Sequence, residues 1–298
     1  MSYPYLSDVV FALTGYQLPL PFATFGLMVA VALLDASSCL SAEMRRLHGA
    51  GMLPMAWRAQ RGVTLRMAPH DVVPNLTLLA MFAGVAGARV FHIFEHLDSF
   101  AVNPSDMIFS RSGLSVLGGL LFGTVAGLWF IRRWHLPARP MLDAVAPAMM
   151  LGYAIGRIGC QVSGDGDWGR VADMALKPDW LPTWFWAQTY TNNIFGEVIA
   201  APGVYPAPVY EIVMALGAFL LLWALRRHAF RQGWLFSLYL VLAGLERLAI
   251  EQIRVNPVLD FGVFHATQAE AIALAMTAGG IAGLLALSRR APSSLKPA

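Results

Sequence analysis

The residues best suited to chemistry lie in one glycine-rich stretch near the middle of the chain, residues 156–170. It reads Gly-Arg-Ile-Gly-Cys-Gln-Val-Ser-Gly-Asp-Gly-Asp-Trp-Gly-Arg, and its charged members are Arg157, Asp165, Asp167 and Arg170. Glycines let a backbone turn tightly, so this stretch can bring both signs of charge close to a polar ligand. An interhelical loop with surface charges is the simpler interpretation. Arg157 argues against it, because it lies within an apolar run, where an arginine is costly.

Two more arginines, Arg89 and Arg247, also lie near the ends of apolar runs. Each such arginine costs about 2.5–3.5 kcal/mol on membrane-insertion scales, so three at similar depth indicate a function. A guanidinium presents a planar fork that matches phosphate oxygens, and the anion available at that depth is a phospholipid headgroup. Glu251 follows Arg247 by four residues and Arg254 follows Glu251 by three, so all three are predicted to share one helical face. A structural ion pair is the competing interpretation there.

Other polar residues in the apolar runs give weaker signals. His92 and His96 have the spacing of helical metal ligands, but the sequence shows no third ligand at a recognisable spacing, and we predict no metal site. Glu211 opens another apolar run, where helix capping and a functional role are equally compatible with an acid. The two cysteines, Cys39 and Cys160, fall at opposite ends of their runs, so we expect no disulfide.

The composition places the chain in a lipid bilayer. Of its 298 residues, 57% are hydrophobic and only 13% are charged, too apolar for a soluble domain of this length. Runs of about 20 apolar residues can cross a bilayer as helices. We therefore predict an all-α polytopic membrane protein, a single integral membrane domain over residues 1–298, with about seven transmembrane helices near residues 22–39, 72–93, 114–131, 141–158, 208–225, 234–253 and 266–287.

The distribution of basic residues predicts the orientation. Most Lys and Arg residues follow the first, third, fifth and seventh runs, and such segments face the cytoplasm. The N-terminus is then outside, the C-terminus is cytoplasmic, and the polar segment 159–207 forms an external loop between the fourth and fifth helices. The formal charge of +3 thus reflects topology, and no basic patch interleaved with aromatic residues indicates nucleic-acid binding.

Glycines spaced four residues apart predict close packing of helices. The clearest series is Gly119, Gly123 and Gly127, and the pairs 152/156 and 279/283 repeat the spacing.

Several short motifs, in this order and spacing, resemble the bacterial prolipoprotein diacylglyceryl transferases. They are Pro-x-x-x-Phe-Gly-Leu-Met at 21–28, Gly-Ala-Arg at 87–89, the stretch 156–170, Tyr-Pro-Ala-Pro-Val-Tyr-Glu at 205–211, and Arg247-x-x-x-Glu251 followed by Arg254. The resemblance implies an inner-membrane enzyme of lipoprotein biosynthesis. It would move the diacylglyceryl group of phosphatidylglycerol onto the cysteine thiol of a prolipoprotein signal peptide, with no metal or organic cofactor.

The resemblance also implies roles for individual residues. Arg157 and Arg247 would bind the phosphate and offset the charge on the departing glycerol phosphate. Glu251 would orient Arg247. Asp165 or Asp167 would accept the thiol proton, since the thiolate is the nucleophile. The predicted phospholipid-binding residues are Arg89, Arg157, Arg170 and Arg247.

Four positions depart from the family pattern. Cys160 and Ser163 stand where the family has asparagines, Phe25 replaces a functional tyrosine, and Leu117 replaces the histidine of a His-Gly-Gly motif. Leucine cannot move a proton. Either a nearby acid takes over, with Asp165, Asp167 and Glu251 as candidates, or the usual reaction is not catalysed. The alternative is a catalytically altered paralogue that binds phospholipid as an accessory protein or acts on a different acceptor.

Overall fold

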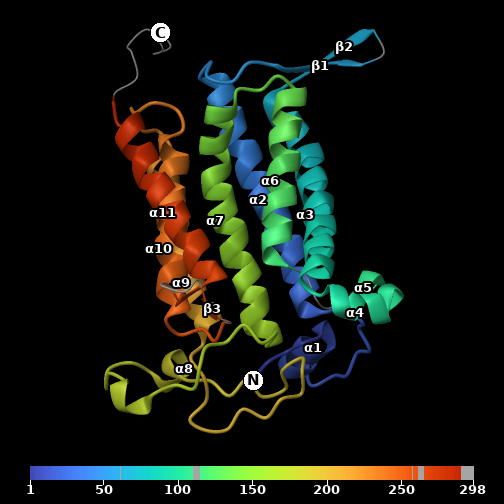
Figure 1. Cartoon of the computed structure of the whole chain (residues 1–298), viewed down its shortest axis with the longest axis vertical. Coiled ribbons are helices and arrows are strands. Elements are labelled where there is room, and N and C mark those ends of the chain that lie inside the picture. Colours follow the sequence, from blue (N-terminus) through green and yellow to red (C-terminus); the bar gives the residue numbers. More distant parts are fainter. Residues whose placement is uncertain (61, 110–114, 257, 261–264, 290–298) are drawn as a thin grey trace. The chain divides into compact units, whose positions relative to one another are not determined.

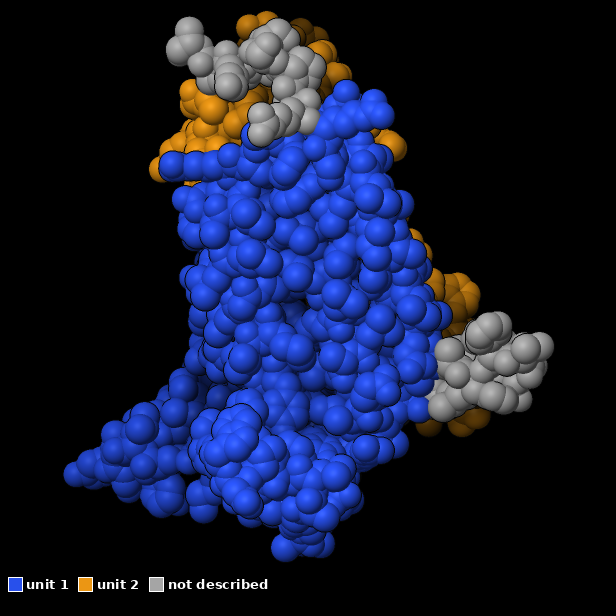
Figure 2. Space-filling model, turned by 90° about the vertical axis from the view of Figure 1, so that its left-hand side faces the viewer, with its two compact units in different colours: residues 1–39, 142–296 blue, residues 40–141, 297–298 orange. Residues whose placement is uncertain are grey.

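The fold is known from a computed structural model, which describes the chain except residues 61, 110–114, 257, 261–264 and 290–298. The chain divides into two compact units, shown in different colours in Figure 2. Unit 1 comprises residues 1–39 and 142–296, and unit 2 comprises residues 40–141 with 297–298. The boundaries fall inside two helices, α2 (Thr24–Gly49) and α7 (Ala138–Ser163).

Unit 1 contains most of α7 and the first part of α2 (Figure 1). Its other elements are α1 (Leu6–Thr14), the 3-10 helix η2 (Met174–Leu176), α8 (Thr183–Trp186), α9 (Ala207–Leu225), α10 (Trp234–Glu251), the antiparallel strands β3 (Val258–Asp260) and β4 (His265–Thr267), and α11 (Gln268–Leu287).

Unit 2 is built around two helices that pack together, α3 (Val73–Glu95) and α6 (Val116–Arg133). The others are the antiparallel strands β1 (Ala56–Gln60) and β2 (Val63–Met67), paired from Ala56 with Met67 to Gln60 with Val63, the 3-10 helix η1 (Pro69–Val72), α4 (Leu97–Val102) and α5 (Pro104–Phe109).

Each predicted apolar run coincides with a long helix: α2, α3, α6, α7, α9, α10 and α11. Within the described part of the chain, five helical segments are long and apolar enough to cross a membrane, namely Thr24–Gly49, Pro69–Glu95, Ala138–Ser163, Ala207–Leu225 and Gln268–Leu287. The five do not include α6 or α10. The 18 residues of α10 carry three charges, Glu246, Arg247 and Glu251.

The helix α7 continues further than the apolar run that predicted it. It ends at Ser163, so residues 159–163 are helical and do not belong to the connecting loop. Residues 164–206 then join α7 to α9 with little regular structure beyond η2 and α8. Arg157 is therefore held on a rigid helix, and the acids that follow it come from a loop.

The hydrophobic core of unit 1 is formed where α7, α9 and α10 meet. Its buried members are Ala146, Met150, Ala154, Ala215, Leu222, Leu235 and Tyr239. Asp143 of α7 fixes the start of α10, because its carboxylate accepts hydrogen bonds from the backbone N–H groups of Gly233 at 2.6 Å and Phe236 at 2.9 Å. These are N–H groups that a helix leaves unpaired at its beginning.

Glycine allows α10 and α11 to pack side by side (Figure 1). A Cβ atom on Gly244 of α10 would lie 2.7 Å from the carbonyl oxygen of Ala273, and one on Gly280 of α11 would lie 2.7 Å from that of Ser237. In unit 2, the predicted packing role is confirmed for Gly119 and Gly123, whose Cβ positions meet the α3 backbone. It is wrong for Gly279 and for Gly156 of α7, which have open space at their Cβ positions.

Adjacent glycines of α11 provide a test of this packing. Gly280→Ala should destabilise the protein by about 1–3 kcal/mol, because the added methyl group overpacks the contact with α10. Gly279→Ala should leave stability unchanged or raise it, since alanine favours a helix and nothing lies within 4 Å. Thermal unfolding of both variants in detergent micelles gives the comparison. Equal melting temperatures would contradict the close approach of the two helices.

Candidate functional site

Arg157 is the centre of a charge cluster in unit 1. It lies on α7 with only 16% of its side chain exposed. Its Nη1 pairs with the carboxylate of Asp167, and its Nε lies 3.2 Å from Oε2 of Glu211. The guanidinium also lies over the ring of Tyr153, 5.1 Å from the ring centroid. A buried guanidinium needs such partners, and Arg157 has two carboxylates and an aromatic face.

A tight turn after α7 brings Asp167 back to Arg157. Gly164 and Gly166 have φ angles of 62° and 91°, in the left-handed region that favours glycine. The N–H of Gly164 donates to the carbonyl of Cys160 at 3.0 Å and closes the helix. The backbone N–H of Asp167 then donates to Oδ1 of Asp165 at 3.3 Å. The glycine spacing noted in the sequence therefore serves to fold the acids over the last turn of α7.

Arg254 is the second cation of the cluster. Its Nη2 lies 2.5 Å from Oδ1 of Asp167, and its Nη1 lies 3.8 Å from Oε1 of Glu211. That Nη1 is buried and makes no hydrogen bond. Two guanidinium groups and two carboxylates thus meet, from α7, the loop after it, the first turns of α9, and the segment after α10. The sequence offered both functional and capping roles for Glu211; its side chain is fully buried against these arginines.

A short set of backbone hydrogen bonds holds these segments together. The N–H of Gly169 donates to the carbonyl of Tyr205 at 2.8 Å, and the N–H of Arg170 donates to that of Ile253 at 2.7 Å. A Cβ atom on Gly169 would lie 2.8 Å from the Ile253 oxygen, so only glycine fits this approach. Because Arg254 follows Ile253 directly, this contact positions its guanidinium beside Asp167.

Arg247 and Glu251 form a separate pair on α10. Nη2 of Arg247 lies 2.7 Å from Oε2 of Glu251. The other oxygen of Glu251 accepts hydrogen bonds from Thr267 Oγ1 at 2.6 Å and Asn256 Nδ2 at 2.7 Å. The spacing predicted that Arg254 would share this helical face, but α10 ends at Glu251 and Arg254 turns to Asp167 instead.

The two aspartates of the loop are in different electrostatic environments. Burial raises the pKa of Asp165. Burial also acts to raise the pKa of Asp167, but the guanidinium groups of Arg157 and Arg254 outweigh it and lower that pKa below its ordinary value. Asp167 is therefore a stable anion in an ion-pair cluster. Asp165 has the greater affinity for a proton, as a general base requires.

The remaining predicted phospholipid-binding residues lie outside this cluster. The side chain of Arg170 is exposed, although its backbone is fixed. Arg89 belongs to unit 2, where its Nη1 donates to the carbonyl of Met107 at 3.1 Å.

The comparisons with known proteins point to one family. A family model described as prolipoprotein diacylglyceryl transferase matches residues 13–286. The chain belongs to the prolipoprotein diacylglyceryl transferase family. A phosphatidylglycerol–prolipoprotein diacylglyceryl transferase of Bacillus anthracis is 29% identical over 212 residues, 71% of this chain and 76% of the relative. One of Dehalococcoides mccartyi is 30% identical over 228 residues, 74% of this chain and 78% of the relative.

Two of the four departures from the family pattern stand at the predicted tyrosine and histidine positions, Phe25 and Leu117. Phe25 of α2 packs over the last turns of α7, where its ring lies 3.3 Å from the Cβ position of Gly159. Leu117 lies in the first turn of α6, in unit 2. Neither side chain can carry a proton. Sequence reasoning did not single out Tyr153 or Glu246, and it gave Arg254 no partner in the loop.

Among the residues that the structure describes, two groups of side chains lie close enough to hold a metal ion. One is Cys160, Asp165 and Asp167; an ion there would meet the guanidiniums of Arg157 and Arg254, which repel it. The other adds Glu95 to His92 and His96, a third ligand that the sequence spacing did not reveal. Glu95 and His96 are exposed, so water competes for both, and we assign no ion to this group.

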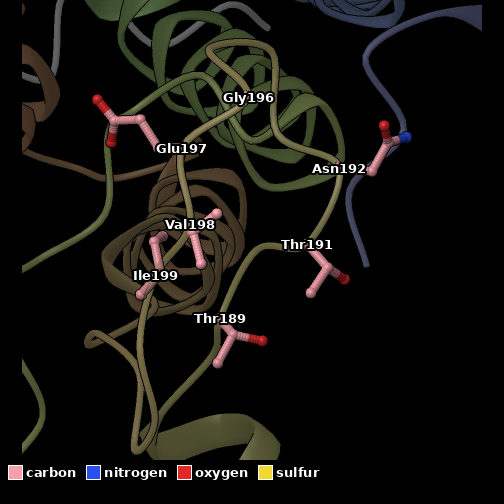
Figure 3. Close-up of a pocket in the computed structure, with 7 residues that line it drawn as sticks. All are labelled: Thr189, Thr191, Asn192, Gly196, Glu197, Val198 and Ile199. Carbon is pink, nitrogen blue, oxygen red and sulfur yellow. The ribbon is translucent and has the colours of Figure 1, made fainter.

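A hollow of about 280 Å³ lies elsewhere in the connecting loop, and Figure 3 shows its lining. It is lined by Thr189, Thr191, Asn192 and residues 196–199, and its charged member is Glu197. An acidic lining repels a phosphate, so this hollow is a poor candidate for a site that binds a phospholipid headgroup.

The ion pairs of Asp167 lead to a pH-dependent prediction. Asp167→Asn should destabilise the protein at pH 7 by about 2 kcal/mol, less than the 3–5 kcal/mol of a fully buried pair, because 32% of the Asp167 side chain is exposed. The pKa of Asp167 is lowered in the folded protein. Its ion pairs therefore stabilise the fold at pH values above the pKa of an aspartate in the unfolded chain, about 3.9. This stabilisation is lost as the pH falls through the pKa of Asp167 in the folded protein.

Denaturant unfolding of the wild type and of Asp167→Asn near neutral pH and in acid measures this difference. The exposed Asp179 supplies the control variant Asp179→Asn, which should match the wild type at both pH values. A stability gap for Asp167→Asn that persists or grows in acid would refute the electrostatic account.

Proposed function

We propose that the cluster around Arg157 transfers the diacylglyceryl group of phosphatidylglycerol to the cysteine thiol of a prolipoprotein signal peptide. Membership of the family supports this reaction, as do the printed names of relatives that share about 30% of their residues with this chain. The observation that carries the proposal is that Arg157 and Arg254 both pair with one partly exposed carboxylate, Asp167, which a phosphate could replace.

The cluster can exchange one of its anions for a phosphate. Glu211 is fully buried, whereas 32% of the Asp167 side chain is exposed. Both arginines contact Asp167, so a phosphate that displaces this carboxylate gains two charge-assisted contacts at once. The buried Nη1 of Arg254, which makes no hydrogen bond, supplies a further donor. Asp167 then holds the arginines in position until the phospholipid binds.

The two arginines also match the charge that the reaction creates. A carbon–oxygen bond to the phosphate breaks, the thiolate sulfur forms the new bond to that carbon, and the departing glycerol phosphate gains a negative charge. Fixed guanidiniums stabilise this charge more in the transition state than in the bound lipid. Asp165 accepts the thiol proton, which the raised pKa of its buried carboxyl favours. Asp165 thereby takes a role that Leu117 cannot fill.

The other predicted site residues take supporting roles in this proposal. Glu251 holds Arg247, and Arg247 offers a third guanidinium to the phospholipid, after those of Arg157 and Arg254. Arg170 and Arg89 contact headgroups of the surrounding membrane lipids.

We further infer a single integral domain in the bacterial inner membrane. The helices α6 and α10 complete seven spans, with the N-terminus outside, the C-terminus in the cytoplasm, and the loop after α7 external. The support is the positive-inside distribution of Lys and Arg.

Arg157→Ala tests the proposal directly. Transfer from radiolabelled phosphatidylglycerol to a synthetic lipobox peptide should fall by at least about 10²–10³-fold, the cost of removing one preorganised donor from a developing anion. Arg139→Ala, which removes an exposed arginine at the other end of α7, should keep wild-type activity.

Binding of labelled phosphatidylglycerol to the same purified proteins separates two failures. Phospholipid binding that depends on Arg157, without transfer by the wild type, would favour the accessory phospholipid-binding function, which the leucine at position 117 and the phenylalanine at position 25 support. Undiminished transfer by Arg157→Ala would sink the assignment of this cluster as the active site.

A further inference from the structure

A tyrosine and two glutamates, one of them Glu211 of the cluster, share hydrogen bonds. The hydroxyl of Tyr153 lies 3.0 Å from Oε1 of Glu211 and 3.1 Å from Oε1 of Glu246. The three side chains come from α7, α9 and α10. The two glutamates are 0% and 8% exposed. Ionisable side chains buried in membrane helices are costly, so such a group calls for a functional explanation.

The hydrogen count of this group is fixed by chemistry. A tyrosine hydroxyl has one hydrogen and can donate to only one of two carboxylates. The other contact is a hydrogen bond only if that carboxyl group is protonated and donates to the tyrosine oxygen. Two neighbouring carboxylates in a low-dielectric site also repel each other when both are ionised. The group therefore holds one proton in addition to that of Tyr153.

The surrounding charges place the extra proton on Glu246. Glu211 faces the guanidiniums of Arg157 and Arg254 at 3.2 and 3.8 Å, which favour its anion. Arg247, next to Glu246 in the chain, pairs with Glu251 instead. The other titratable groups nearby are Asp167, paired with both cluster arginines, and Tyr239 of the α10 core. Neither is a cation, so neither favours the ionised form of Glu246.

We propose that Glu246 is the proton-holding residue of a relay, Glu246 to Tyr153 to Glu211, which supplies a proton to the departing phosphate. Glu246 gives its proton to the Tyr153 oxygen, Tyr153 gives its own to Glu211, and Glu211 gives one to the phosphate oxygen whose bond to carbon breaks. Glu246 is left as the anion, and Tyr153 and Glu211 return to their starting states.

The relay and Asp165 together balance the protons of one turnover. Asp165 gains the thiol proton, and the phosphate gains the relay proton. Asp165 then releases its proton, Glu246 takes one up, and the enzyme is restored. The acid, Glu246, and the base, Asp165, are thus separate groups, as acid–base catalysis at one pH requires. This inference rests on the proposed transfer reaction for its role, but the protonated state of Glu246 can be measured without it.

The first test measures the proton itself. Infrared difference spectra between the wild type and Glu246→Gln at neutral pH should contain the carbonyl band of a protonated carboxylic acid. Glu197→Gln, at an exposed glutamate, should give only carboxylate bands. Absence of the acid band from the Glu246 difference overturns the proposal, whether or not the protein transfers lipid.

The second test measures the role in transfer. Glu246→Gln keeps the shape and a hydrogen-bond donor but carries no transferable proton, so kcat should fall about 100-fold, with KM little changed. In the wild type, activity should fall as the pH rises and Glu246 ionises. This fall should be absent from Glu246→Gln. Glu246→Asp should recover part of kcat.

Tyr153→Phe interrupts the relay and should reduce kcat to a similar extent, and the double variant Tyr153→Phe with Glu246→Gln should be no slower than either single variant. Wild-type kcat in Glu246→Gln, or independent effects that multiply in the double variant, would refute the relay. A wild type that shows the acid band but transfers nothing would instead refute the transfer reaction, and with it the relay's role.

Discussion

The structure of unit 1 depends on the cost of placing the Arg157 guanidinium in an apolar helix. Removing a charge from water costs several kcal/mol even after the surroundings relax, and only close, well-oriented countercharges offset this cost. Glu211 and Asp167 provide them. Neither lies on α7, so the loop and the start of α9 must both reach the same turn of that helix.

This requirement explains the glycines around the cluster. Gly164 and Gly166 turn the chain through φ angles that other residues rarely adopt. Gly169 lets the loop backbone meet the carbonyl of Ile253. That last contact brings in Arg254, which makes the charges even: two cations against Asp167 and Glu211. A cluster with equal numbers of cations and anions needs no ligand to balance its charge, as the proposed exchange of its more exposed anion, Asp167, for a phosphate requires.

Sequence reasoning succeeded where the signal was local. Apolar runs predicted the long helices, because burial in lipid requires uninterrupted apolar residues. Arg157 stood out because an arginine in such a run is costly. The acids at 165 and 167 were candidates because glycines flank them. The end of α10 could not be predicted from the local sequence. Helical spacing placed Arg247, Glu251 and Arg254 on one face, yet the helix ends at Glu251. A contact with the loop, 87 residues from Arg254 in the chain, decided the outcome.

Tyr153 and Glu246 show why the rest of the site escaped prediction. Each has an unremarkable sequence setting, and they lie 93 residues apart. Only the packing of α7 against α10 brings them together. Their position also bears on the leucine at 117. Without a histidine at that position, proton transfer falls to other groups, such as carboxyl groups. Two carboxyl groups differ in proton affinity only when their surroundings differ. Here the arginines create that difference. Both pair with Asp167 and with Glu211, whereas Asp165 and Glu246 have no ion pair with either arginine, and for this reason the proposed mechanism assigns the exchange of protons to them.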